Sequence, residues 1–194
     1  MIKAIIFDFF GVLSTEGFKL FCDTHFPNDP QKRKRAVQLV TSHDAGVLTK
    51  DEYAKGLAQL ANADLSIVMK NMSNNTPNEL LLAYIKENLK PKYKIGMLSN
   101  AGDDYISQIL PPSDLSIFDD VVLSYRHGMV KPQKEMFEFA TKRLDVLPAE
   151  AVFVDDSAGH CAGAVIAGLK AIQYTDFPQM KNELEKLLAA NSNN

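Results

Sequence analysis

Four short apolar runs, each ended by a polar or acidic residue, constrain the fold of this 194-residue chain most strongly. The runs cover residues 4–7, 95–98, 121–123 and 151–154. Such short, nearly continuous apolar runs are typical of strands that are buried on both faces of a parallel sheet. Residues 171–174 form a weaker fifth candidate. We therefore expect a parallel sheet at the centre of the molecule.

The segments between these runs have the apolar spacing of helices. In residues 132–144, Pro132 suits the first helical turn. Thr76 and Glu79 have the spacing of a capping box, which predicts a helix that starts there and continues through Leu89. A closing helix is expected over residues 177–190. Strands that alternate with helices predict a doubly wound α/β core.

Residues 14–75 break this alternation, because they contain several helical patterns and no convincing strand. Thr49 and Glu52 predict a capping box at the start of one of these helices. We expect two parts: a core made of residues 1–13 and 76–194, and a small all-helical cap made of residues 14–75.

Charge and composition restrict the class of partner. The chain has 21 Lys and Arg against 24 Asp and Glu, a net charge of −3, so nothing favours nucleic acid or an anionic membrane. No apolar stretch approaches the roughly 18 residues of a membrane span. Cys22 and Cys161 are too few for a disulfide framework. We expect a cytoplasmic protein with a small-molecule substrate; no pattern indicates an oligomeric state.

The residues that end the strands should converge, because ligands bind beyond the carboxyl ends of strands in open parallel sheets. These residues are Asp8, Ser99, Ser124, Asp155 and Asp156. If the first and fourth strands are neighbours, three carboxylates meet. Each pair at about 4 Å would repel by roughly 4 kcal/mol at an effective dielectric constant of 20. Mg²⁺ is the cation that best fits such a cluster.

The same residues resemble the four motifs of the haloacid dehalogenase superfamily, in the right order and over nearly the whole chain. The matching segments are Phe7-Asp8-Phe9-Phe10-Gly11-Val12-Leu13, Leu98-Ser99-Asn100, Lys131-Pro132 and Val154-Asp155-Asp156-Ser157. The resemblance implies a Rossmann-like core with a helical cap inserted after the first motif. It also implies a hydrolase, most often a phosphatase.

In this family the first-motif aspartate is the nucleophile, which implies that Asp8 attacks phosphorus and forms an aspartyl-phosphate. The resemblance also implies a Mg²⁺ site. Its ligands would be Asp8, the backbone carbonyl of Phe10, and Asp156 with Asp155 close by.

The resemblance assigns further roles around the phosphoryl group. Ser99 and Lys131 would be catalytic with the nucleophile, the hydroxyl as a donor and the ammonium as a fixed positive charge. The substrate-binding positions would be Phe10, Gly11, Ser99, Asn100 and Lys131.

Phe10 departs from the family pattern, because phosphatases of this family carry a second aspartate there to protonate the leaving oxygen. A phenyl ring cannot transfer a proton, and general acid–base catalysis contributes about 10²- to 10⁴-fold. Three functions remain open: a phosphatase for small phosphate monoesters, a weakened phosphate-binding protein, and a carbon–halogen hydrolase of the 2-haloacid dehalogenase type. His160 is a candidate substitute proton carrier.

Overall fold

The computed structural model describes residues 1–104 and 106–192, and a five-stranded sheet forms its centre. Every pair of neighbouring strands is parallel, and the order is β3-β2-β1-β4-β5. All four predicted strands and the weaker fifth candidate are present, so the predicted doubly wound α/β core is confirmed. The strands are β1 (Ala4–Phe7), β2 (Lys94–Ser99), β3 (Asp120–Leu123), β4 (Ala151–Asp155) and β5 (Lys170–Gln173).

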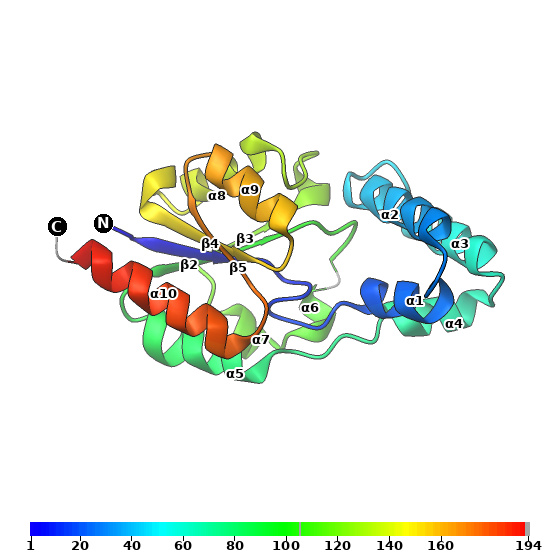
Figure 1. Cartoon of the computed structure of the whole chain (residues 1–194), viewed down its shortest axis with the longest axis horizontal. Coiled ribbons are helices and arrows are strands. Elements are labelled where there is room, and N and C mark those ends of the chain that lie inside the picture. Colours follow the sequence, from blue (N-terminus) through cyan, green and yellow to red (C-terminus); the bar gives the residue numbers. More distant parts are fainter. Residues whose placement is uncertain (105, 193–194) are drawn as a thin grey trace.

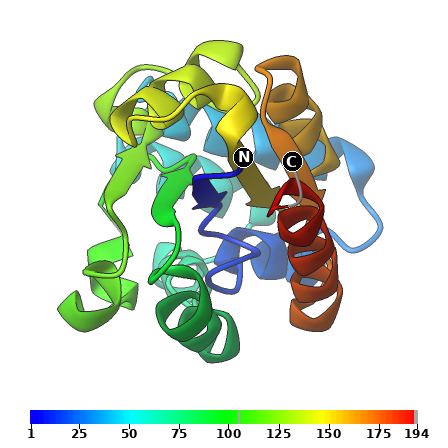
Figure 2. The ribbon, with the colours of Figure 1, turned by 90° about the vertical axis from the view of Figure 1, so that its left-hand side faces the viewer.

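Helices cover both faces of the sheet (Figures 1 and 2). One face carries α5 (Glu79–Tyr84), the π-helical turn that continues it (Ile85–Leu89) and α10 (Phe177–Ser192). The other carries α8 (Lys134–Arg143) and α9 (Ala158–Ile166). The shorter helices are α6 (Ile106–Ile109), α7 (Pro112–Leu115) and the 3₁₀ turns Ser124–Arg126 and Pro148–Glu150.

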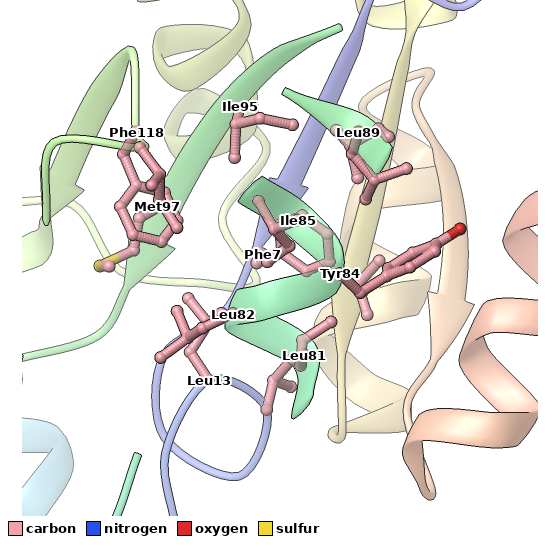
Figure 3. Close-up of a cluster of buried hydrophobic side chains, with 14 of the residues drawn as sticks. Phe7, Leu13, Leu81, Leu82, Tyr84, Ile85, Leu89, Ile95, Met97 and Phe118 are labelled. Carbon is pink, nitrogen blue, oxygen red and sulfur yellow. The ribbon is translucent and has the colours of Figure 1, made fainter. Parts of the chain in front are cut away.

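Strand β1 is apolar throughout because its side chains alternate between two separate cores. Ile5 and Phe7 point into the cluster beneath α5 and α10, whereas Ala4 and Ile6 point into the cluster beneath α8 and α9. Figure 3 shows Phe7 beside Ile85 in the first of these clusters. Full burial of a large apolar side chain contributes about 1.5–3 kcal/mol. This double burial holds the end of β1, and hence the residue that follows it, in a fixed place.

Two predicted helix starts are wrong by two residues each. Helix α5 begins after Asn78 and not at Thr76, because the Asn78 side chain accepts from the Leu81 N–H and also donates to the Val12 carbonyl. Helix α8 begins at Lys134, so Pro132 lies before its first turn. At α5, the contact with the distant residue Val12 fixes the cap at Asn78.

The helical segment 17–72 lies at one end of the sheet (Figure 1). It consists of α1 (Gly17–His25), α2 (Pro30–Asp44), α3 (Lys50–Ala61) and α4 (Leu65–Met72), packed around a cluster of its own. The predicted capping box of Thr49 and Glu52 is present at the start of α3. The domain limits at 13/14 and 75/76 stay a prediction. No helix in the described part of the chain is long and apolar enough to cross a membrane.

Candidate active site

Three carboxylates meet at the carboxyl edge of the sheet. Asp8 directly follows β1 and Asp155 ends β4, and these strands are neighbours, with Phe7 opposite Val154. The Asp8 N–H donates to the Val154 carbonyl at 2.8 Å. One oxygen atom each of Asp8, Asp155 and Asp156 lies within 4.8 Å of the other two. The structure thus brings together the three acidic residues that the sequence pattern had placed at this edge.

Lys131 is the buried cation of this cluster. Its Nζ donates to Asp8 Oδ1 at 2.6 Å and to Asp155 Oδ2 at 2.7 Å, and its side chain is only 1% exposed. Asn100 fixes the Lys131 backbone, because the amide of Asn100 accepts from the Lys131 N–H at 2.8 Å and donates to the Lys131 carbonyl at 3.1 Å. Both ends of the Asn100 amide are therefore occupied in positioning Lys131.

One lysine cannot neutralise three carboxylates, and their pKa values reflect this. Burial raises the pKa of Asp8 to about 8, with Asp155 adding to the rise and Lys131 opposing it. Burial also acts to raise the pKa of Asp155, but Lys131 and His160 outweigh it and hold that pKa at about 2. The pKa of Asp156 is raised by burial and by the charge of Asp155. These carboxylates are hard oxygen donors, so a divalent cation would fit them.

The turn after Asp8 leaves room for Asp156. Phe10 forms a backbone bridge with Ser14, and the Gly11 N–H donates to the Ser14 carbonyl at 2.7 Å. Gly11 has a φ of +87°, and a Cβ atom there would lie 2.6 Å from Asp156 Oδ2. The ring of Phe10 packs edge-on against Phe9, with 4.9 Å between ring centroids.

A cavity of about 350 Å³ opens between this cluster and the helical segment 17–72. Of the predicted site residues, it is lined by Asp8, Phe10, Asn100, Lys131 and Asp156. Ser99 and Gly11 are not among the described residues that line it. Ser99 is fully buried at the end of β2, and its hydroxyl donates to the Asn100 carbonyl at 3.4 Å.

His160 and Ser124 also lie close to this cavity. His160, at the start of α9, lines it and directs its Nδ1 atom at Asp155 Oδ2, 3.0 Å away. Ser124, which follows β3, connects the core to the helical segment: its Oγ accepts from the Ala101 N–H at 2.9 Å and donates to the Asp44 carbonyl at 2.7 Å.

The helical segment contributes cavity residues that sequence reasoning did not single out. They include Val37, Val40 and Asp44, together with Glu16, which directly precedes the segment; the aromatic residues Phe18 and Tyr53 also line the cavity. Burial raises the pKa values of Glu16 and Asp44 to about 7. No local spacing marks these residues, since they converge only through the packing of α1, α2 and α3.

Comparisons with known proteins agree with this architecture. The family model described as "Hydrolase: haloacid dehalogenase-like hydrolase" matches residues 2–168. D-ribitol-5-phosphate phosphatase of Bacteroides thetaiotaomicron is 26% identical over 97% of this chain and 99% of its own length. Pyrophosphatase PpaX of Bacillus cereus is 25% identical over 90% of this chain and 84% of its own length.

Solved structures of the same family share the fold. A HAD family enzyme from Bacteroides thetaiotaomicron, in complex with magnesium and inorganic phosphate, superimposes with a TM-score of 0.69 at 22% identity, covering 91% of this chain and 98% of that chain. L-2-haloacid dehalogenase from Xanthobacter autotrophicus gives a TM-score of 0.66 at 20% identity, covering 96% and 83%. With its family model, parallel core and acidic edge in agreement, the chain belongs to the haloacid dehalogenase-like hydrolases.

Proposed function

We propose that this hydrolase is a Mg²⁺-dependent phosphatase for small phosphate monoesters, acting through an aspartyl-phosphate at Asp8. The observation that carries the proposal is the carboxylate cluster with its buried lysine, which faces a cavity large enough for a small ester. The phosphatases among its relatives support the same reaction class.

The donor set suits Mg²⁺. Asp8, Asp155 and Asp156 offer hard oxygen ligands, and Gly11 leaves the space that Asp156 occupies. Asp8, Asp156 and the Phe10 carbonyl would hold the ion, with Asp155 behind them. An ion bound there would supply Lewis-acid stabilisation of the phosphoryl charge.

The protein's own residues orient the nucleophile. Lys131 holds one oxygen of Asp8, which leaves the other oxygen of that carboxylate to attack phosphorus. The Lys131 ammonium donates a second hydrogen bond to Asp155, and Asn100 fixes the lysine backbone. Asp8 is thereby restrained at the floor of the cavity. The same ammonium group lies where it can stabilise negative charge on the phosphoryl oxygens.

The charge of the cavity lining favours an uncharged leaving group. Among the described residues that line the cavity, Lys131 is the only lysine or arginine, whereas Glu16, Asp44 and Asp156 are acidic. A leaving group such as a sugar or polyol meets no repulsion there. A pyrophosphate or a haloacid would bring a further negative charge, and the described lining residues offer no second lysine or arginine to receive it.

The acidic pair at the end of β4 separates the phosphatase from the carbon–halogen hydrolase. An aromatic residue at Phe10 is compatible with a dehalogenase, but halide displacement has no use for the acidic pair of Asp155 and Asp156. A weakened phosphate-binding protein would use the same cluster without turnover. Both alternatives therefore become outcomes of one experiment.

The test measures phosphate release from p-nitrophenyl phosphate, acetyl phosphate, sugar phosphates, ribitol 5-phosphate and pyrophosphate, with Mg²⁺ or with EDTA. We expect Mg²⁺-dependent turnover that Asp8→Asn abolishes, with pyrophosphate a poor substrate. Halide release from 2-chloropropionate in EDTA would instead establish the dehalogenase. Phosphate binding by calorimetry with no turnover of any ester would establish the binding protein.

A further inference from the structure

The proposed phosphatase lacks a proton donor at the position where its family carries one. Phe10 occupies that position; it lines the cavity, and its ring packs against that of Phe9. An alkyl phosphate leaves as an alkoxide unless a proton reaches its oxygen, so the reaction needs an acid from elsewhere. This inference rests on the proposed function, because it concerns the same cavity and the same reaction.

Asp44, the last residue of α2, is tied to the core side of the site. Ser124 Oγ donates to the Asp44 carbonyl and accepts from the Ala101 N–H. Ala101 adjoins Asn100, whose amide holds the Lys131 backbone. A short path of hydrogen bonds therefore fixes Asp44 relative to Lys131, which in turn holds the nucleophile. Asp44 lines the same cavity as Asp8.

The carboxyl group of Asp44 is not engaged by the described residues: it forms no hydrogen bond or ion pair with them. Lys131, in contrast, holds both Asp8 and Asp155. The charged groups that act on Asp44 are Lys131, Glu16 and Asp103. Burial raises the pKa of Asp44 to about 7, Glu16 and Asp103 add to the rise, and Lys131 opposes it. At neutral pH this carboxyl group can both give and accept a proton.

We propose that Asp44 is the general acid and base of this active site, in the role left open by Phe10. As an Asp8 oxygen forms its bond to phosphorus, the bond from phosphorus to the leaving oxygen breaks. The leaving oxygen keeps the electron pair and takes the proton of Asp44, which releases a neutral alcohol. Asp44, now a carboxylate, then removes a proton from a water molecule as that water attacks phosphorus. The bond to Asp8 breaks, its electron pair returns to the Asp8 carboxylate, and phosphate leaves.

Two other groups near the cavity are less suited to this role. The pKa of Glu16 is raised by burial and next by the charge of Asp156, a carboxylate that the proposed function assigns to the metal. The Nδ1 atom of His160 is engaged by Asp155 at 3.0 Å. The charge that acts most strongly on Asp44 is that of Lys131, which donates a hydrogen bond to Asp8.

The test compares esters whose leaving groups differ in their need for a proton. We expect Asp44→Asn to lower kcat/KM for a sugar or polyol phosphate by about 10²- to 10⁴-fold. The loss for p-nitrophenyl phosphate should stay below about tenfold, because nitrophenolate leaves without a proton. The wild-type kcat/KM for the alkyl ester should fall above about pH 7 as Asp44 ionises. The Asp44→Asn variant should not show this decrease.

Glu16→Gln is the matched control, because it removes the other unassigned carboxyl group of the cavity. It should leave the ratio of the two kcat/KM values at the wild-type level. In the Asp44→Asn background, Phe10→Asp should restore turnover of the alkyl ester, which a variant that merely misfolds would not do.

Equal losses for both esters in Asp44→Asn, or a leaving-group-dependent loss in Glu16→Gln instead, would overturn the assignment of Asp44. The Asp8→Asn variant keeps the two proposals apart. If wild-type turnover survives Asp8→Asn, the proposed function itself is wrong. If turnover requires Asp8 but shows no dependence on Asp44, only this inference fails.

Discussion

Replacing Lys131 by methionine would remove the cation that compensates Asp155. Asp155 is fully buried, has a pKa of about 2 and lies 2.7 Å from the Lys131 Nζ atom. At an effective dielectric constant of 20, that contact is worth about 6 kcal/mol of attraction. Protonation of Asp155 in the variant would recover part of this loss. We therefore expect Lys131→Met to lower the free energy of unfolding by about 3–5 kcal/mol at pH 7, as for other broken buried ion pairs.

Urea unfolding in EDTA, followed by circular dichroism, would measure this loss. The matched control is Lys134→Met, because Lys134 pairs with Glu138 at 2.9 Å on an exposed face, where solvent screens the pair, so its loss should leave the free energy of unfolding nearly unchanged. The deficit of Lys131→Met should shrink as the pH falls from 7 to 4, since its Asp155 becomes protonated there while the wild-type residue stays ionised. A loss below 1 kcal/mol, or one independent of pH, would refute the electrostatic reasoning.

Three further predictions concern the neighbouring residues. Gly11→Ala should weaken Mg²⁺ binding at least about tenfold by calorimetry and destabilise the fold by about 1–3 kcal/mol, because its methyl group meets Asp156 and its φ is +87°. The pKa of Asp8 is 3.8 without its folded environment and about 8 within it, so wild-type stability in EDTA should fall as pH rises from 4 to 8. Asp8→Asn should lose that slope in urea unfolding and exceed the wild type at pH 8. Ser124→Ala removes the hydrogen bond to the Asp44 carbonyl and should lower kcat for alkyl esters more than it raises KM, as steady-state kinetics would show.

The sequence predicts this sheet well because the three central strands, β1, β2 and β4, are buried on both faces, which leaves nearly continuous apolar runs. The same logic places Asp8, Asp155 and Asp156 correctly, since each follows directly from a strand end. Helix starts are less predictable. Asn78 displaces Thr76 as the cap of α5 because its amide also donates to the Tyr174 hydroxyl, 96 residues away.

The cavity wall opposite the carboxylates could not be predicted in this way. Asp44 and Lys131 are 87 positions apart and belong to elements with no common repeat or spacing. Their proximity depends on how α2 docks against the loops of the core, through contacts such as that of Ser124. Local patterns report the burial of a segment and carry no information on which distant loop it meets.

The uneven burial of β1 and α2 also gives the site two levels of local stability. All four residues of β1 are fully buried, whereas Ala36 and His43 are the only buried residues of α2. Amide hydrogens in β1 should therefore exchange with solvent only through global unfolding, and those at the end of α2 through smaller local openings. The proposed nucleophile directly follows a fully buried strand, so local opening of the opposite wall, which would let product leave, should not disturb it.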